Sequence, residues 1–282
     1  MSPDFKKLPI SAVMVIYNEE KVLERALKSF CDVVEEIIIV HDGKCTDKSL
    51  EIARKYTDKV FELEHVGVAE KHRPFTYKKA KNDWILQVDA DEYLSRELKN
   101  NLEKMISDKV DVYEASYSIY PHQYFSHKRI LFKKSRVYLL GFTHESIMPL
   151  DDKVKIRRIK SRMMHEPLYD NFSFRVFQKK FKPWAKIHAK ILLQDFRDIS
   201  KWNCALTKWD ARRRLLIRYP LLLGMMAATV FKGVSYIRLF LYHRKVSMLK
   251  VGINACMYSF CLYYYVSKYK RKNQSQSIRT GI

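Results

Sequence analysis

The sequence of 282 residues predicts an α/β protein in which a mostly parallel sheet is flanked by helices, followed by a basic helical region. Three observations support this fold class. Short runs rich in β-branched residues alternate with helical patterns through the first third of the chain. Several of these runs end abruptly in polar residues, as expected where strand ends meet at one edge of a sheet. The charge then changes sharply, because nearly all the excess of Lys and Arg lies in the second half.

The elements follow one another in a regular order. The expected strands are residues 10–16, 36–40, 59–63 and a run that begins at Trp84, with helical patterns over 22–30, 48–56 and 67–81 between them. This alternation predicts a doubly wound sheet with right-handed crossovers. Further strands are expected at 111–118, 129–134 and 137–140. We therefore expect one sheet with its functional edge at the carboxyl ends of the first strands.

The stretch Trp84–Glu92 is the centre of this arrangement. Its apolar run ends in three carboxylates, Asp89, Asp91 and Glu92. Their mutual repulsion requires a cation nearby, and a hard divalent ion with oxygen ligands is the simplest candidate. The alternative is that the acidic residues begin the next helix, because carboxylates favour a helix N-terminus.

The charge pattern indicates two different tasks for the two halves. Residues 1–150 contain 24 Lys and Arg against 24 Asp and Glu, whereas residues 151–282 contain 29 against 7. No acidic residue follows Asp210, so the net charge of +22 comes entirely from the second half. A basic half predicts a polyanionic partner. The five cysteines show no metal-like pairing and no signal sequence precedes the first strand, which together favour a cytoplasmic protein.

Three motifs in order carry a resemblance to a known family. They are Val15-Ile16-Tyr17-Asn18-Glu19-Glu20, then Ile39 to Asp47 with His41-Asp42-Gly43, then Asp83-Trp84 through Asp89-Ala90-Asp91-Glu92. Over about the first 170 residues the chain resembles family 2 glycosyltransferases of the GT-A fold. It is most similar to membrane-associated enzymes that extend lipopolysaccharide core or other lipid-linked glycans. His41 departs from the family pattern, which more often has a small or acidic residue there.

The resemblance implies a site for a nucleotide-sugar donor and for Mg²⁺ or Mn²⁺. The donor-binding residues that it implies are Tyr17, Asn18, Glu19, Asp42, Arg73, Asp89 and Ala90. The implied metal ligands are Asp91, Asp89 and His165. Asp42 would accept a hydrogen bond from the base or ribose, and Asp89 would contact the ribose or the metal. For Lys71 and His72 we expect a solvated helix face, and His165 alone is also compatible with a structural role.

Glu145 is the expected general base. It is the only Asp or Glu between Glu114 and Asp151, and the resemblance places a His-Glu pair at His144-Glu145. An inverting transferase needs a carboxylate to take the proton of the attacking acceptor hydroxyl. The alternative is a surface glutamate in a hairpin.

The sequence predicts a boundary near residue 170, with a catalytic domain at 1–170 and a basic helical region at 171–282. An amphipathic segment lies at Phe172–Trp184, where we expect Pro183 to interrupt any helix. The apolar runs 219–231 and 251–266 fall short of the ~20 residues that span a membrane. Their basic flanks favour helices that lie in the interface of an anionic membrane, although an ordinary core pair is the alternative. The tail 273–282 is expected to be flexible.

These observations predict an inverting, metal-dependent glycosyltransferase, peripheral on the inner face of a membrane, that transfers a sugar to a lipid-linked or glycan acceptor. Two other classes of function stay open. The basic half could bind nucleic acid, which its long apolar runs disfavour. The chain could also be a catalytically inactive scaffold, which the carboxylates Asp89, Asp91 and Glu145 disfavour.

Overall fold

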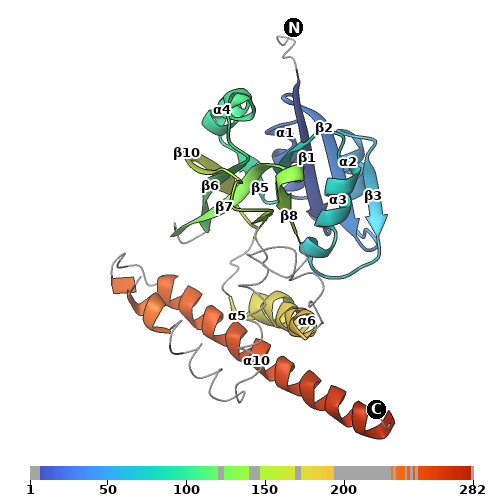
Figure 1. Ribbon diagram of the computed structural model, residues 1–282, viewed down its shortest axis with the longest axis vertical. Coiled ribbons are helices and arrows are strands. Elements are labelled where there is room, and N and C mark those ends of the chain that lie inside the picture. Colours follow the sequence, from blue (N-terminus) through green and yellow to red (C-terminus); the bar gives the residue numbers. More distant parts are fainter. Residues whose placement is uncertain are drawn as a thin grey trace. The chain divides into compact units, whose positions relative to one another are not determined.

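The structure is a computed structural model that describes residues 7–119, 124–139, 147–168, 173–193, 230, 233–238, 240–241, 244 and 247–280. Contacts divide the chain into two compact units, Met1–Tyr169 and Asp170–Ile282, called unit 1 and unit 2 below. Figure 1 shows the sheet of unit 1 with its helices and the long helix of unit 2.

Unit 1 contains an eight-stranded mixed sheet. Its strands, in chain order, are β1 (Leu8–Ile16), β2 (Val34–Asp42), β3 (Val60–Leu63), β4 (Trp84–Gln87), β5 (Glu92–Leu94), β6 (Val112–Ile119), β7 (Tyr124–Lys133) and β10 (Ile156–His165). A separate two-stranded sheet pairs β8 (Val137–Tyr138) with β9 (Met148–Pro149). The helices are α1 (Leu23–Lys28), α2 (Ser49–Arg54), η1 (Ala69–Lys71), α3 (Arg73–Lys79), α4 (Arg96–Ser107) and η2 (Lys134–Arg136).

The strand order in the large sheet is β3-β2-β1-β4-β7-β6-β10-β5. The first four strands are parallel, as expected from the alternation of strands and helices. Strand β7 then pairs antiparallel with both β4 and β6, β10 pairs parallel with β6, and β5 pairs antiparallel with β10. The predicted α/β class with a mostly parallel sheet is therefore confirmed, with a mixed section added after β4, called the antiparallel section below because three of its four pairings are antiparallel.

Side-chain alternation along β1 builds a core on each face of the sheet. Ala12 and Met14 face a core shared with α1 and α4, while Val13 faces a second core with Tyr77 from the α3 side. All of these side chains are buried. Two buried faces explain why the central strands read as continuous apolar runs.

The antiparallel section curls. Strands β4 and β5 are separated in the sheet by three strands, a distance of roughly 19 Å if the sheet were flat. The chain from Gln87 to Glu92 spans at most about 18 Å when fully extended. It is shorter here, because Glu92 N–H donates to the Asp89 carbonyl oxygen at 3.0 Å. The far strands must therefore bend back toward the end of β4.

Unit 2 contains two helical runs. The first passes from α5 (Phe174–Val176) through a π-helical stretch (Phe177–Phe181) into α6 (Lys182–Leu192). The second is the 34-residue helix α10 (Ser247–Thr280). Ala189 and Leu192 of α6 pack with Val266 of α10.

One expectation for this region differs from the structure. Pro183 does not interrupt the first run: it is the second residue of α6, which follows directly on the π-helical stretch Phe177–Phe181. The hydrogen-bond pattern changes from π to α at this point, so the missing N–H of proline falls where the regular α-helical pattern is already altered. The helix α10 continues as far as Thr280, with no Gly or Pro between Gly252 and Gly281, and the flexibility of the tail stays a prediction.

Among the described residues, no helix combines the length and apolar character that crossing a membrane would require. The run 251–266 lies inside α10, whereas most of the run 219–231 lies outside the described residues.

Candidate active site at the acidic turn

The acidic turn, residues Asp89–Glu92, connects β4 to β5. It is closed by two hydrogen bonds between its ends, from Glu92 N–H to the Asp89 carbonyl and from Asp89 N–H to Glu92 Oε2 at 2.9 Å. Ala90 is buried within it. The residues that follow form strand β5, and helix α4 begins only at Arg96, capped by Ser95. The alternative that these carboxylates begin a helix is therefore wrong.

Two basic side chains neutralise one side of the turn. Lys128 of β7 places its Nζ 2.7 Å from Asp89 Oδ2 and 2.6 Å from Glu92 Oε2. Arg73, at the start of α3, donates from Nη2 to Asp89 Oδ1 at 2.9 Å. The cation that the repulsion between carboxylates requires is thus supplied, for Asp89 and Glu92, by the protein itself.

The charges of this cluster follow from burial and pairing. Burial alone would raise the pKa of Asp89, but Lys128 and Arg73 hold that pKa well below its usual range. Burial raises the pKa of Glu92; Lys128 opposes the rise and the Asp89 charge adds to it. Burial works against the charge of Lys128, yet the two carboxylates raise its pKa. Asp89 and Lys128 consequently stay charged, and Glu92 is the carboxylate of the cluster that takes up a proton first as the pH falls.

Asp91 points to a different partner. Its Oδ2 lies 3.3 Å from Nε2 of His165 at the end of β10, and both side chains are partly accessible. The antiparallel pairing of β5 with β10 sets this approach, because His165 lies opposite Glu92 in the register. The next residue, Glu166, donates its N–H to the Asp91 carbonyl at 2.9 Å. The sequence-predicted pair of Asp91 and His165 is brought together.

The three expected metal ligands do not form one cluster. The Asp89 carboxylate faces Arg73 and Lys128, and no group of three His, Cys, Asp or Glu side chains arranged for a metal occurs among the residues that the structure describes. Asp91 and His165 nevertheless fit a divalent ion. Mg²⁺ is commonly bound by one or two carboxylates together with the phosphates of a substrate.

The ends of β1 and β2 carry the other expected donor residues. The ring of Tyr17 is half-exposed and lies 4.9 Å from that of His65 and 5.9 Å from that of His41. Asn18 has a positive φ of 53° and donates its N–H to Nε2 of His41 at 3.2 Å. The other ring nitrogen of His41 lies 2.6 Å from the Gly43 carbonyl. His41 thus connects Asn18, in the loop after β1, with Gly43, in the turn after β2. This departure from the family pattern holds together the two loops next to Tyr17.

Asp42 differs from the expectation of a group that faces the donor. It is only 4% exposed, and its carboxylate accepts the N–H groups of Val66 at 2.7 Å and Gly67 at 2.9 Å. Nε2 of His72 lies 2.9 Å from the same carboxylate. Asp42 thus holds the loop after β3.

Two further residues of this edge depart from or add to the expectation. A solvated position for His72 is wrong, because His72 is buried and bonded to Asp42, whereas Lys71 is exposed as expected. Glu19 donates its N–H to Ser49 Oγ at 2.7 Å, which ties the end of β1 to the start of α2.

The expected general base Glu145, with its neighbour His144, lies outside the described residues.

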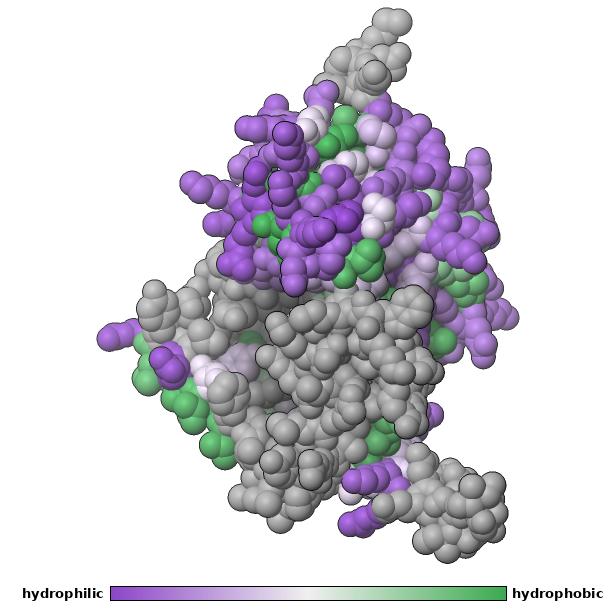
Figure 2. All heavy atoms as spheres, viewed as in Figure 1, coloured by the Kyte–Doolittle hydropathy of each residue, from purple (hydrophilic) through white to green (hydrophobic). Residues whose placement is uncertain are grey.

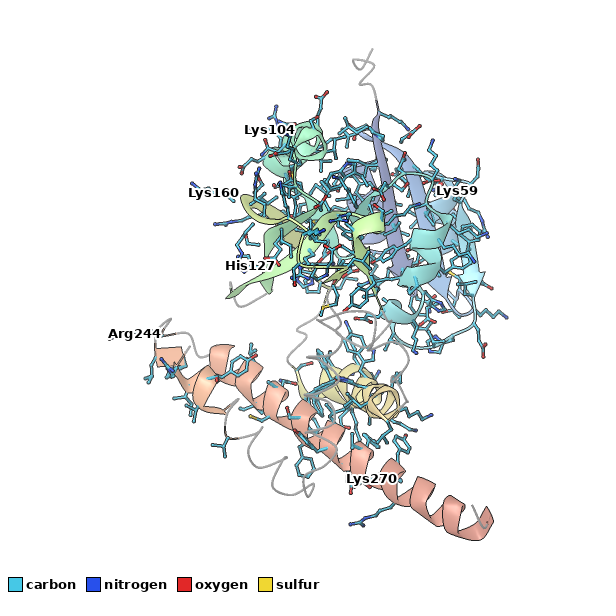
Figure 3. All side chains as sticks on the ribbon, in the orientation of Figure 1. Lys59, Lys104, His127, Lys160, Arg244 and Lys270 are labelled. Atoms are coloured by element: carbon cyan, nitrogen blue, oxygen red, sulfur yellow. The ribbon has the colours of Figure 1, made fainter. Side chains whose placement is uncertain are left out.

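Sequence reasoning missed the residues that complete the turn. No local sequence pattern marks Lys128 or His65 as a site residue. The same is true of Glu166, whose carboxylate accepts from Tyr93 Oη at 2.5 Å and pairs with Arg25 at 2.5 Å. Figure 3 shows Lys104 on α4 and Lys160 on β10 among the side chains at the outer surface of unit 1. In Figure 2 the visible face of unit 1 is mostly hydrophilic.

Comparisons with known proteins find relatives over part of the chain. An uncharacterized glycosyltransferase of Rickettsia bellii is 37% identical over 100 residues, which cover 36% of this chain and 33% of the relative. The lipopolysaccharide core biosynthesis glycosyltransferase LpsC of Rhizobium meliloti is 28% identical over 106 residues, which cover 36% of this chain and 38% of LpsC. The chain thus matches only about a third of the length of these relatives.

A solved structure resembles the chain over a longer stretch. The mannosyltransferase PcManGT from Pyrobaculum calidifontis, in complex with GDP-Man and Mn²⁺, covers 93% of this chain and 89% of its own at 14% identity, with a TM-score of 0.47. The family model of glycosyl transferase family 2 matches residues 11–172, more than half of the chain and all strands of the large sheet from β2 to β10. The chain therefore belongs to glycosyl transferase family 2.

Proposed function

We propose that the chain is a metal-assisted, inverting glycosyltransferase that transfers a sugar from a nucleoside-diphosphate donor to a lipid-linked or glycan acceptor at a membrane surface. The observation that carries the proposal is the acidic turn at the carboxyl edge of the parallel strands, with Asp91 and His165 paired beside it. Open α/β sheets bind their ligands at this edge.

The residues around the turn suit the parts of such a donor. Tyr17 offers a half-exposed ring on which a base can stack, supported by His65. Asp91 and His165 would hold Mg²⁺ or Mn²⁺, which supplies positive charge for the leaving diphosphate. Arg73 and Lys128 keep Asp89 in place next to these groups. Glu145 would take the proton of the acceptor hydroxyl during a single displacement.

Binding of donor and metal together tests this proposal. We expect nucleoside diphosphates and their sugar conjugates to raise the melting temperature only when Mn²⁺ or Mg²⁺ is present. At a ligand concentration of 100 times Kd the gain in unfolding free energy is about 2.7 kcal/mol. A screen of uridine, guanosine and cytidine donors by thermal unfolding would also identify the base. Equal stabilisation in EDTA would show that the metal has no role in donor binding.

Unit 2 supports the membrane part of the proposal. Its two helical runs, 173–193 and 247–280, contain no Asp or Glu. Exposed apolar side chains occur on both runs, among them Phe174, Ile253 and Phe260. Charge and apolar surface together are typical of helices that lie on anionic lipid. The similarity to LpsC supports a lipopolysaccharide-core acceptor.

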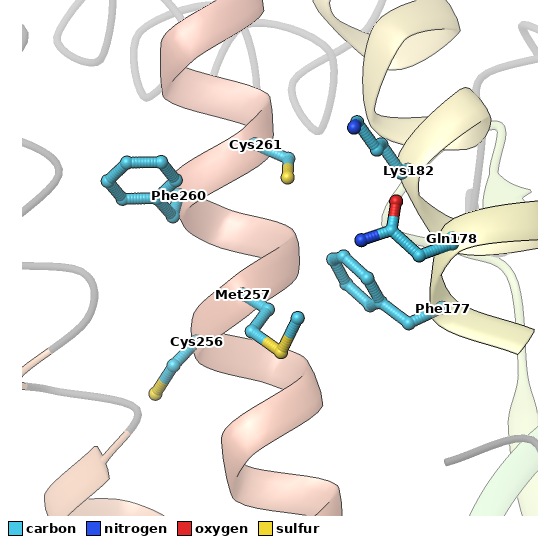
Figure 4. A pocket seen from close by; sticks show the side chains of 7 residues that line it. All are labelled: Phe177, Gln178, Lys182, Cys256, Met257, Phe260 and Cys261. Atoms are coloured by element: carbon cyan, nitrogen blue, oxygen red, sulfur yellow. The ribbon is translucent and has the colours of Figure 1, made fainter. Parts of the chain in front are cut away.

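A pocket of about 330 Å³ lies between the two runs. In Figure 4, Phe177, Gln178 and Lys182 project from the first run toward α10, where Met257 and Cys261 complete the wall. An apolar pocket with a lysine at its border suits a hydrocarbon chain that carries an anionic group. This chemistry agrees with an acceptor on a lipid carrier.

Vesicle binding tests the membrane part separately. Lys268, Lys270 and Arg271 are exposed on α10. Each basic residue near an anionic surface contributes about 1 kcal/mol, so changing all three to Gln should lower the partition coefficient roughly 100-fold. The matched control changes Lys104, Lys109 and Lys160 of unit 1, which are also exposed, and should leave binding unchanged. Equal losses in both variants, or stronger binding to an oligonucleotide than to vesicles, would contradict membrane attachment.

A further inference from the structure

Lys128 contacts the acidic turn from β7 and takes no direct part in the proposed reaction. Its ammonium group bridges Asp89 and Glu92, and its side chain is only 16% exposed. It comes from β7, which pairs antiparallel with β4 and therefore carries Lys128 past the carboxyl end of that strand. A buried lysine shared by two carboxylates is costly to desolvate, and its bonds fix the geometry of both partners.

Lys128 determines where the Asp89 carboxylate points. Both carboxylate oxygens are occupied, Oδ1 by Arg73 at 2.9 Å and Oδ2 by Lys128 at 2.7 Å. Asp91, two residues later, approaches His165 instead. The turn therefore separates its carboxylates: Asp89 and Glu92 bind the protein's own cations, whereas Asp91 lies beside His165.

We propose that Lys128 is a positioning residue that holds Asp89 out of the coordination shell of the divalent ion. The chain then offers Asp91 and His165 to the ion, and tight binding requires the oxygens of the donor diphosphate. The positive charge of Lys128 adds to this dependence, since it repels an ion that arrives without the diphosphate. This inference rests on the proposed function. It adds that the divalent ion binds tightly only together with the nucleotide.

Two variants isolate the role of Lys128. Lys128→Met alone would leave Glu92, which is 3% exposed, without its counter-ion, so the protein could fail to fold for that reason. The double variant Lys128→Met/Glu92→Gln removes both charges, and Asp89 keeps its bond to Arg73. Binding of Mn²⁺ is measured by electron paramagnetic resonance, with and without UDP or GDP. Melting temperatures confirm that each variant is folded.

We expect wild-type protein to bind Mn²⁺ weakly in the absence of nucleotide and much more tightly in its presence. In the double variant, Asp89 Oδ2 loses its lysine while Oδ1 stays bonded to Arg73. Oδ2 can then become a further ligand of the ion that Asp91 and His165 bind, so Mn²⁺ alone should bind at least about tenfold tighter. The factor by which nucleotide tightens Mn²⁺ binding should fall correspondingly, because the coupling is reciprocal. Adding Asp89→Asn to the double variant should abolish the gain, because the amide replaces the carboxylate that would bind the ion. The double variant itself removes one positive and one negative charge, so its gain does not come from a change in net charge.

Controls come from the same strand and the same turn. Lys133→Met removes another lysine of β7, one that pairs with Asp111 at 3.0 Å, and should leave Mn²⁺ binding unchanged. Lys128→Arg keeps the charge and should keep the dependence on nucleotide. Tight Mn²⁺ binding by wild-type protein alone, or wild-type behaviour in the double variant, would overturn the role of Lys128. Absence of Mn²⁺ binding under every condition would instead overturn the metal-assisted function itself.

Discussion

The variant Asp91→Ala is expected to lose the metal-dependent stabilisation by nucleoside diphosphates. Asp91 and His165 are the proposed ligands of the ion, and alanine removes the carboxylate of this pair. Loss of an outer-shell partner already costs 10–100-fold in metal affinity, so loss of a ligand should cost at least about 100-fold. At a fixed ligand concentration this removes most of the stabilisation, which thermal unfolding with UDP or GDP and Mn²⁺ measures.

The same variant should barely change the stability of the free protein. Asp91 is partly accessible and lies outside the ion pairs by which Lys128 and Arg73 neutralise Asp89 and Glu92. Asp58→Ala removes an exposed carboxylate from the turn before β3 and serves as the matched control. Retention of the full Mn²⁺-dependent shift in Asp91→Ala would place the metal elsewhere.

The second large effect is expected from Glu145→Gln. If Glu145 takes the proton of the acceptor hydroxyl, glutamine preserves the shape and removes the base. General-base assistance contributes about 10²–10⁴-fold, so turnover should fall by that factor while donor affinity stays nearly constant. Turnover with a lipopolysaccharide or lipid-linked acceptor and donor affinity from titration provide the two readouts. Joint loss of melting temperature and donor affinity would instead indicate a structural glutamate.

The structure narrows the alternatives for this base. Glu92 is a poor candidate, because its carboxylate is buried and accepts hydrogen bonds from Lys128 and from Asp89 N–H. Asp151 is exposed and lies 3.6 Å from Arg136. Near-normal turnover in folded Glu145→Gln would therefore direct attention to Asp151, and Asp151→Asn would be the next variant.

Local patterns were sufficient to predict the parallel part of the sheet. The runs that became β1, β2 and β4 are rich in apolar and β-branched residues, and their burial on both faces follows directly from that composition. The carboxyl edge could be predicted as well, since strand direction alone decides where Asp89 and Asp91 lie. The approach of Asp91 to His165 was implied by the family resemblance, and the pairing of β5 with β10 produces it.

The partners of Asp89 could not be predicted, because they depend on strand pairing over long separations. Lys128 reaches the turn only since β7 inserts antiparallel between β4 and β6, and no local pattern encodes that neighbour. His72 was misjudged for a similar reason. In sequence it lies in a basic helical segment, but the loop after β3 brings it to Asp42.

The curl of the antiparallel section has a consequence for how the protein is made. Synthesis proceeds from the N-terminus, so β1 to β4 and the three carboxylates leave the ribosome before Lys128 does. Until β7 arrives, Asp89 and Glu92 repel each other without their lysine. Insertion of β7 beside β4 then gains an ion pair in addition to backbone hydrogen bonds. The strand that extends the sheet beyond β4 thus also brings the lysine that neutralises the acidic turn, so the turn reaches its final charge balance only after β7 has paired.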